Sequence, residues 1–567
     1  MTTAYFSARP DPSAREALAP LAVVACVVAA ARVAPAVDLL PVLGVFQGAL
    51  GWALLAAGAI ASALRAWPLT ERAAAVPPAA LFCGSTLLFL ACGLPYVRGL
   101  QASGDEVEYL MLTQSLWREH DLDLEDNFAR GDHLEYTPGQ GAMPFGTFRR
   151  DGRPISTHSP GLPFLLAPVY ALGGRAACVV MLALLASWLA LETRALALRA
   201  TGDAQAAFLA WLASVGPPAF FYSFHVYTEV PSALAVALAL RLLLGAPGPW
   251  GAAGAALALG ALPFLHVKMV PAAAVLGLLG LVRLRGRARL AFAMVALLMA
   301  GAYAFHYWRI FGDPSPLALY GSRLPKKVKR ADPLDALPGL FLDSSYGLLF
   351  NAPVFLLSIA GALGLHRLRR QTRSGARGEA ATPWEHAGAV TAVGLATLLP
   401  LIVWQTWWAG HCPPARFLVP LVPWLAVLAA ARVAASPTGL ARWRFGLALG
   451  GLALGAFMSQ SPRDHLLLNT PSQPTHVWEA LAGSPEPGVQ PARVPSAGRY
   501  LPRLVVADAA ESRVAVTWTG ALLLLLTLDV LARRHARVAR LFRGPGLALA
   551  LLLLTGAVID AWARGAP

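Results

Sequence analysis

Acidic, basic and histidine side chains occur in this chain at the ends of long apolar runs, where a simple connection would need none of them. In chain order they are Asp105, Glu106, His158, Glu229, His266, Lys268, Lys326, Lys327, His411 and Arg416, with Tyr109 and Tyr346 among them. A carboxylate at a membrane surface can take a proton from a hydroxyl or an amine. Lysine and arginine can hold a phosphate. These residue types therefore predict proton transfer and phosphate binding.

The acid pair Asp105-Glu106 opens a polar segment that follows a long apolar run. Ser103 followed three residues later by Glu106 fits a capping box, which predicts that a helix starts here. The apolar spacing after it is typical of a short amphipathic helix lying along the membrane surface. Two interpretations stay open. Acids in a first turn favour the helix dipole, or Asp105 and Glu106 are catalytic carboxylates, with Tyr109 close by on the same helix.

Histidine and lysine side chains also occur at other points where the chain is expected to re-enter the membrane. His158 is either a hydrogen-bonded interface residue or a substrate ligand. His266 and Lys268 interrupt apolar runs that are joined with almost no loop, and ionisable residues at membrane depth are functional candidates by default. A lysine that snorkels to the surface is the alternative for Lys268. Glu229 either pairs with Lys268 or holds a substrate hydroxyl.

Two later segments suit a charged or sugar-like ligand. Arg323, Lys326, Lys327, Lys329 and Arg330 place five cations in eight residues, which favours either anionic lipid head groups or a substrate phosphate. The run from Trp407 to Arg416 contains two tryptophans and His411. Tryptophan suits an interfacial belt and equally a surface for a sugar ring, while the guanidinium of Arg416 can grip a phosphate at two points. Tyr346, in Asp343-Ser-Ser-Tyr346, is a further substrate-binding candidate.

The elements that must position these residues are transmembrane helices. Apolar residues make up 57% of the chain and charged residues 14%, against about 25% charged residues in a soluble domain. Apolar blocks long enough to cross a bilayer recur along nearly the whole sequence. They lie near 17–36, 41–64, 77–97, 176–198, 204–222, 229–245, 250–267, 269–283, 289–310, 346–365, 387–408, 417–435, 443–460, 514–532 and 544–562. The sequence predicts an all-α polytopic membrane protein with about 13 to 15 transmembrane helices.

Arginine-rich connections set the expected orientation. They lie at 283–289, 367–377 and 533–543, and the count of spans places all three on the side of the N-terminus. The positive-inside rule makes that side cytoplasmic. The long segments 98–159, 311–345 and 461–512 then face outward, together with the candidate residues, so we expect one outward-facing site. Alanine-, arginine- and proline-rich composition suggests a bacterial inner membrane.

Cofactor and nucleic-acid motifs do not occur in the sequence. It has no Walker A or Rossmann glycine pattern, no HExxH and no CxxC among five cysteines. We therefore expect no cofactor, although scattered carboxylates and histidines leave a divalent metal possible. The net charge of +15 fits cytoplasmic loops of a membrane protein, so no nucleic-acid partner is expected.

Several of these motifs together resemble a known superfamily. Asp105-Glu106 at the start of a long first outer loop, a helix with Tyr109 and the return through His158-Ser-Pro-Gly-Leu-Pro are similar to the GT-C integral-membrane glycosyltransferases, such as protein O-mannosyltransferases and the lipid A aminoarabinose transferase. Leu265-His-Val-Lys268, Asp343-Ser-Ser-Tyr-Gly-Leu-Leu-Phe350 and Pro413-Pro-Ala-Arg-Phe417 look like bacterial members with the RgtA/B/C/D-like domain. The resemblance covers residues 77–435, flanked by extra spans in 1–76 and by 436–567, which holds the outer loop 461–512.

The resemblance implies an inverting glycosyltransferase. Its donor would be a sugar on a polyprenyl phosphate, and its acceptor a lipid, glycan or protein reached from the periplasmic side. Asp105 would be the catalytic base or orient the acceptor, Glu106 would be its neighbour, and basic residues would hold the departing phosphate. Two other functions stay open: a cell-envelope polysaccharide polymerase or ligase that uses a pyrophosphate-linked oligosaccharide, and a lipid-linked sugar transporter.

Overall fold

The computed structural model describes most of the chain. The described residues are 14–66, 75–139, 147–245, 247–323, 333–362, 385–404, 406–436, 438–460, 466–469, 476–482, 497–505, 509–543 and 545–564. The expected phosphate ligands Lys326 and Lys327 and the arginine-rich connection at 367–377 lie outside these residues.

Helices account for nearly all the regular structure. Those in the first half are α1 (Ala14–Ala30), α2 (Ala34–Leu39), η1 (Pro41–Phe46), α3 (Ala49–Ala66), α5 (Pro78–Gly99), α6 (Asp105–Arg118), α7 (Glu125–Arg130), η2 (Asp132–Glu135), α8 (Gly161–Thr201), α9 (Ala204–Val215), α10 (Ala219–Tyr222), α11 (Glu229–Leu244), α12 (Pro249–Leu265), η3 (Val267–Met269) and α13 (Val270–Arg283). Between η2 and α8 the strands β1 (Thr147–Phe148) and β2 (Pro154–Ile155) pair antiparallel.

The second half continues the same architecture. Its helices are α14 (Gly286–Phe311), η4 (Ala318–Arg323), α16 (Pro333–Leu342), α17 (Leu348–Asn351), η5 (Pro353–Phe355), α19 (Glu385–Ile402), η6 (Arg416–Leu421), α20 (Val422–Ala435), η7 (Gly439–Trp443), α21 (Arg444–Gln460), α22 (His476–Ala482), η9 (Ala497–Tyr500), α23 (Ala509–Ala532), α24 (Ala536–Leu541) and α25 (Gly546–Arg564).

Six of the described helices are long and apolar enough to cross a membrane. They are Pro78–Gly99, Gly161–Thr201, Gly286–Phe311, Arg416–Ala435, Glu511–Ala532 and Gly546–Arg564. Shorter apolar helices run beside them at Leu21–Ala30, Ala204–Val215, Pro249–Leu265, Pro353–Ala362 and Gly388–Ile402. The predicted class, an all-α polytopic membrane protein, is confirmed. The predicted number of 13 to 15 crossings stays a prediction, because length and composition identify fewer.

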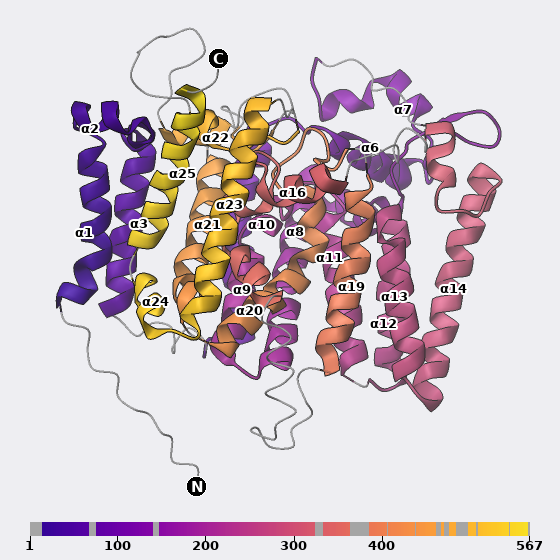
Figure 1. Cartoon of the computed structure of the whole chain (residues 1–567). Coiled ribbons are helices and arrows are strands. Elements are labelled where there is room, and N and C mark those ends of the chain that lie inside the picture. The colour runs from indigo at the N-terminus through magenta and orange to yellow at the C-terminus, as the bar shows by residue number, and fades with distance from the viewer. Residues whose placement is uncertain are drawn as a thin grey trace.

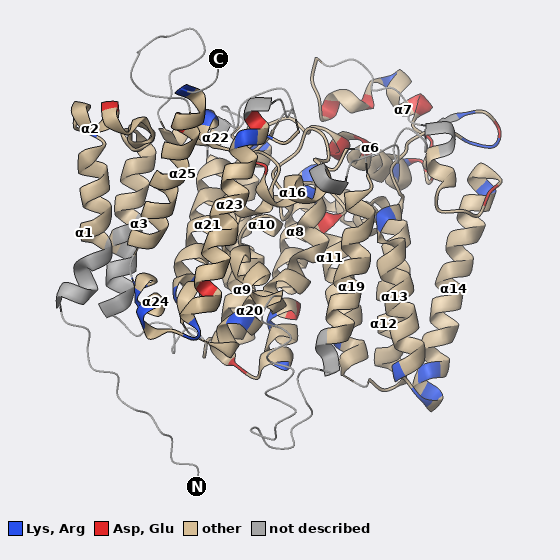
Figure 2. Ribbon diagram, in the orientation of Figure 1, with Lys and Arg blue, Asp and Glu red and all other residues tan. Residues whose placement is uncertain are grey.

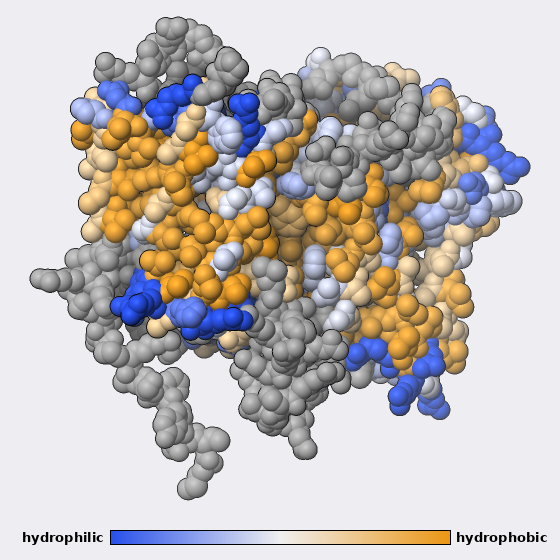
Figure 3. All heavy atoms as spheres, viewed as in Figure 1, coloured by the Kyte–Doolittle hydropathy of each residue, from blue (hydrophilic) through white to orange (hydrophobic). Residues whose placement is uncertain are grey.

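The long helices stand side by side as one bundle, with short helices gathered at one end (Figure 1). The end that carries α2, α6, α7, α16 and α22 is called the α6 end below. Residues on the visible face are hydrophobic over the middle of the bundle and hydrophilic towards both ends (Figure 3). This distribution is what a helix bundle in a bilayer requires, because lipid tails contact the middle and water contacts the ends.

Basic residues gather at the end of the bundle opposite α6. Figure 2 shows lysine and arginine at the turn between α13 and α14 and along α24. These are two of the three arginine-rich connections found in the sequence, and they do lie on one side. The cytoplasmic location of that side stays a prediction, as does the position of the N-terminus.

The buried core joins helices from α5 to α24. Its largest cluster includes side chains of α5, α8, α9, α11, α12 and α20, and α8 packs against α9, α11 and α5. The first and last helices instead pack on each other, since α1, α3 and η1 contact α25 or α22. The division into 1–76, 77–435 and 436–567 stays a prediction.

The segment 160–173 follows the first outer loop. In the structure it forms the first part of α8 and is separated from the rest by non-helical torsions at Gly173 and Gly174. Its buried residues Leu162, Leu166 and Tyr170 share a cluster with α6. The segment therefore packs against α6.

Candidate active site

The position of Asp105 is set by the glycine before it. Gly104 is the N-cap of α6 and has φ +59°. A Cβ atom at Gly104 would lie 2.9 Å from both the carbonyl oxygen of His411 and the hydroxyl of Tyr227. Only glycine fits this torsion and this space without strain. The predicted capping box is wrong, because no side chain caps this helix; the chain turns too sharply at Gly104 for Ser103 to reach the first-turn amides.

Arg416 joins two of the predicted carboxylates. Its Nη2 donates to Asp105 Oδ2 at 2.6 Å and its Nε donates to Glu229 Oε1 at 2.7 Å. The guanidinium lies 4.3 Å from the ring centroid of Tyr227. The Arg416 side chain is 4% exposed, whereas that of Asp105 is 37% exposed. Asp105 and Arg416, 311 positions apart in the sequence, are thus in contact, and the negatively charged side chain is the more exposed of the two.

His158 is held between two carboxylates of α6. Its Nε2 lies 3.4 Å from Asp105 Oδ2 and its Nδ1 lies 2.9 Å from Glu108 Oε2. Burial opposes protonation, but Glu108 and Asp105 outweigh it and raise the pKa of His158 to about 10. His158 is therefore an imidazolium at neutral pH.

Asp105 is correspondingly fixed as a carboxylate. Burial alone would raise its pKa, yet Arg416 and then His158 lower the pKa of Asp105 well below its usual value. Both cations bind Oδ2, and Oδ1 receives no hydrogen bond from the described residues. One oxygen of this partly exposed carboxylate is left to face a ligand.

Glu106, the other predicted catalytic acid, points elsewhere. It is 1% exposed, its Oε2 pairs with Arg175 Nη2 at 3.1 Å and its Oε1 accepts from the backbone N–H of Val226 at 3.2 Å. Neighbouring helix positions do not share a face, which explains why Glu106 leaves the cluster of its neighbour. Its catalytic role stays a prediction; its contacts hold the start of α6 onto α8 and the segment before α11.

Glu229 pairs with Arg416. The ion pair with Lys268, one of the two predicted alternatives for Glu229, is not found. Glu229 Oε2 is buried without a hydrogen-bond partner among the described residues. Lys268 instead places its Nζ 3.1 Å from the ring centroid of Phe417 and 4.7 Å from that of Trp404. This aromatic contact stabilises a cation where few water molecules reach it.

His266 and Lys268 lie in the turn between α12 and α13, at the edge of the cluster. His266 Nδ1 accepts from the backbone N–H of Lys268 at 3.1 Å. Burial and the neighbouring Lys268 lower the pKa of His266 well below its usual value. The ring is therefore neutral, with its proton on Nε2. A neutral donor and a cation face the same region as Asp105 and Arg416.

Aromatic rings and apolar side chains form the walls around His158. The Tyr109 ring meets the His158 ring edge-on at 4.7 Å between centroids. A small pocket opens beside His158, between α6, the segment after β2 and the end of α14. Its lining includes Leu112, Ser156, His306, Tyr307 and Phe311.

Two other predicted substrate ligands lie behind or beside the cluster. Tyr346 is 3% exposed, and its backbone oxygen accepts from Ala415 N–H at 3.0 Å, so it supports the segment that precedes Arg416. His411 is exposed and approaches Gly104 through its backbone oxygen. Their predicted contacts with substrate stay predictions, as do those of Tyr109, His158, Glu229, His266, Lys268 and Arg416.

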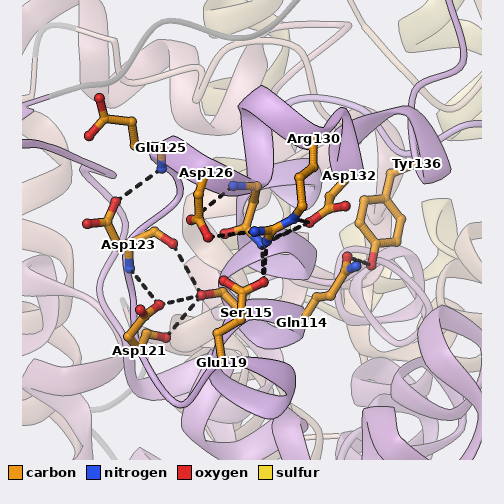
Figure 4. Close-up of polar contacts among 11 residues, drawn as sticks. Gln114, Ser115, Glu119, Asp121, Asp123, Glu125, Asp126, Arg130, Asp132 and Tyr136 are labelled. Carbon is orange, nitrogen blue, oxygen red and sulfur yellow. Dashed lines mark hydrogen bonds and ion pairs between the residues drawn. The ribbon is translucent and has the colours of Figure 1, made fainter.

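The many acids of the first outer loop form a separate network. Arg130 donates to Asp126 at 2.6 Å, to Asp132 at 3.1 Å and also to Glu119 (Figure 4). The carboxylates of Glu119, Asp121, Asp123, Asp126 and Asp132 all accept hydrogen bonds there and so shape the segment 119–132. Among the described residues, no group of three or more histidine, cysteine or acidic side chains is arranged to hold a metal ion.

Burial also distinguishes α6 from the expected surface helix. Its residues Glu106, Val107 and Tyr109–Ser115 are buried, and the hydroxyl of Tyr136 donates to Gln114 at 2.8 Å (Figure 4). Protein covers both faces of α6, because the first outer loop folds over it.

Sequence reasoning missed Glu108 and Tyr227. Glu108 stands three residues after Asp105, and this spacing places both on one helix face, so the signal was present in the motif. Nothing in the sequence around Tyr227 indicated its contact with Arg416.

No family model and no curated protein matches this chain. Solved structures do. One is ArnT from Cupriavidus metallidurans bound to undecaprenyl phosphate, with 16% identity and a TM-score of 0.38 over 84% of this chain and 78% of that chain. Another is the apo oligosaccharyltransferase of Archaeoglobus fulgidus, with 13% identity and a TM-score of 0.41 over 68% of this chain and 56% of that chain.

A further match is the archaeal oligosaccharyltransferase AglB from Archaeoglobus fulgidus in complex with an inhibitory peptide and a dolichol-phosphate, with 12% identity and a TM-score of 0.38 over 67% of this chain and 56% of that chain.

Proposed function

We propose that this protein is an inverting membrane glycosyltransferase. Its donor is a sugar linked to a polyprenyl phosphate, and its acceptor is a lipid, glycan or protein of the cell envelope. The reaction takes place at the α6 end of the bundle, which would face the periplasm if the arginine-rich end faces the cytoplasm of a bacterial inner membrane.

The observation that carries the proposal is the arrangement of charges around Asp105. A partly exposed carboxylate is held through one oxygen by Arg416 and His158, and its second oxygen is open to a ligand. Lys268 and the His266 ring lie beside the same region. Such a site offers an acceptor for a proton next to cations for a phosphate, which is what transfer from a phosphate-linked sugar demands.

Each group at the site would have one role in the reaction. The acceptor hydroxyl or amine attacks the anomeric carbon from the face opposite the phosphate, and its proton passes to Asp105 Oδ1. The bond between the anomeric carbon and the phosphate oxygen breaks, and its electron pair leaves with polyprenyl phosphate. Since the pKa of Asp105 is low, the carboxylate takes the proton late, when bonding to the sugar has already made the nucleophile acidic.

Positive charge would stabilise the departing phosphate. Lys268 and the Arg416 guanidinium are cations at this end, and His158 is a third. Glu229 Oε2 has acceptor capacity that the described residues do not use, so it is suited to a hydroxyl of the sugar. Tyr109 would provide an apolar wall beside the ring of His158.

The test is single-turnover consumption of a panel of polyprenyl-phosphate sugars by the full chain in nanodiscs. Membrane extract supplies acceptors. Asp105→Asn is compared with wild type and with Asp38→Asn, a matched control, because Asp38 is exposed on α2. The proposal expects wild type and Asp38→Asn to release polyprenyl phosphate and Asp105→Asn to be slower by at least about a hundredfold.

Other outcomes would change the proposed function or the role assigned to Asp105. Consumption of undecaprenyl-pyrophosphate oligosaccharides, without use of any monophosphate donor, would favour a polymerase or ligase. Equal turnover by Asp105→Asn and wild type would contradict the assigned role of Asp105.

A further inference from the structure

We propose that Glu108 is a positioning residue of this site: it holds His158 between two carboxylates and so presents Asp105 with one oxygen engaged and the other open. This inference rests on the proposed function for its effect on rate, but the contact itself is testable without any donor.

Glu108 and Asp105 lie on one face of α6, one turn apart, and the His158 ring bridges them. Glu108 Oε2 is 2.9 Å from His158 Nδ1 and Asp105 Oδ2 is 3.4 Å from His158 Nε2. The side chains of Glu108 and His158 are each 14% exposed. The ring is thus fixed at both nitrogens by groups from a single buried helix.

Ser156 completes the clamp at Nδ1, the same ring nitrogen that Glu108 contacts, with its hydroxyl 3.1 Å from that nitrogen. Its hydroxyl donates to Glu108 Oε2 and accepts from the backbone N–H of His158 at 3.1 Å. Residue 156 follows β2 directly, so the hairpin carries this contact. The edge of the Tyr109 ring limits movement in the remaining direction.

Only one protonation state of His158 satisfies both carboxylates. A neutral imidazole has one N–H and one lone pair. Either tautomer would turn a lone pair towards a carboxylate oxygen, which repels it. The imidazolium donates from both nitrogens, so Glu108 makes the charged form the stable one. Without Glu108, the ring would be free to lose its proton and to turn away from Asp105 Oδ2.

Other titratable groups also face this ring. Asp105, Glu108 and Tyr109 face it from α6, and His306 and Tyr307 of α14 line the pocket beside it. Further away, Arg416 shares Asp105 with His158, and His266 and Lys268 lie across the cluster. Glu108 is the closest carboxylate to the ring, and the raised pKa of His158 agrees with its influence.

The experiment compares Glu108→Gln with Glu125→Gln. Both remove one negative charge at the same end of the bundle, and Glu125 is exposed on α7. The titration of His158 is followed by NMR of protein labelled at histidine Cε1, with His158→Gln identifying the resonance. Single-turnover rates are measured over the same pH range with the most active donor.

Glu108→Gln should lower the His158 titration midpoint by at least about one pH unit. Its rate should fall as pH rises from about 7 to 9, because the imidazolium is lost in that range, while wild type and Glu125→Gln stay level. Glu108→Asp, which keeps the charge on a shorter arm, should restore most of the titration midpoint. It also serves as the second variant if Glu108→Gln does not fold.

Two results would overturn the inference: an unchanged His158 titration in Glu108→Gln, or a shifted titration with an unchanged pH profile of the rate. If wild type consumes no donor, the proposed function fails on its own. The NMR titration then still decides whether Glu108 sets the state of His158.

Discussion

The candidate span Arg416–Ala435 carries a buried arginine near each end, and the two arginines bind aspartates in different ways. Arg432, near the last residue of this span, donates to Asp529 through Nε and Nη2, and both side chains are fully buried. Each oxygen of Asp529 accepts two hydrogen bonds, with Leu440 N–H and Arg533 as the other donors. At the α6 end, Arg416 leaves Asp105 Oδ1 open and Glu229 Oε2 without a partner among the described residues.

This difference separates a structural ion cluster from a site. A closed cluster joins α20 to α23 and has no capacity left for a ligand. The cluster around Asp105 keeps unused acceptor oxygens next to cations, which costs stability in the absence of substrate and is typical of functional sites. The predictions below test this contrast.

The largest effect on stability should come from Asp529→Asn. The substitution leaves the buried Arg432 with a neutral partner, and breaking a buried pair costs about 3–5 kcal/mol. Thermal unfolding of the protein in nanodiscs should show a clearly lower midpoint. An unchanged midpoint would contradict the structural assignment of this cluster.

Arg416→Lys should lower both activity and stability. Arginine donates to Asp105 and Glu229 at once from fixed directions, and an ammonium cannot reproduce this geometry. We expect a single-turnover rate lower by about tenfold or more. Arg432→Lys is the matched control at the other end of the span, and it should lower the unfolding midpoint without lowering the rate of the folded protein. A rate loss in Arg432→Lys alone would reverse the comparison.

Gly104→Ala should displace Asp105 with a smaller effect. The backbone at Gly104, with φ +59° and ψ −137°, lies in a region that only glycine adopts readily. Such strain costs about 1–3 kcal/mol for a residue with a Cβ atom, and the added atom meets His411 and Tyr227. We expect a rate lower by about tenfold. Gly152→Ala also places a Cβ atom at a positive φ, +83°, but the added atom meets nothing within 4 Å, so its rate should match wild type. Equal losses in both variants would show that strain alone is responsible.

A separate effect concerns the pH dependence of stability. Because the pKa of His158 rises from 6.5 to about 10 on folding, its protonation stabilises the fold fully below pH 6.5, and this contribution is lost as pH rises towards about 10. His158→Gln should therefore flatten the decline of the unfolding midpoint over that range. A wild-type midpoint that does not fall between these pH values would contradict the assigned pKa.

Sequence patterns predicted the fold class because hydropathy determines what can cross a bilayer. They also identified Asp105, His158, Glu229 and Arg416, since ionisable residues at span ends need a reason to be there. The patterns could not reveal which partner each of these side chains would bind. Glu229 pairs with Arg416, whereas Lys268 contacts aromatic rings. The packing of α11, η3 and η6 determines these partners.

The acid pair shows most clearly what helical geometry adds. Asp105 and Glu106 were considered together because they are adjacent, yet adjacent positions on a helix point about 100° apart. Glu106 turns to Arg175, and Glu108, one turn after Asp105, joins the cluster. The periodicity needed for this assignment was present in the sequence, whereas the sharp turn at Gly104 depends on the distant residues His411 and Tyr227.

The most direct test of the contrast measures Asp105→Asn and Asp529→Asn side by side, with thermal unfolding and single-turnover donor consumption on the same preparations. Asp105→Asn should unfold near the wild-type midpoint and lose at least about a hundredfold in rate. Asp529→Asn should unfold at a lower midpoint and keep the wild-type rate per folded molecule. If Asp105→Asn turns over donor as wild type does, the open cluster at the α6 end is not the catalytic site.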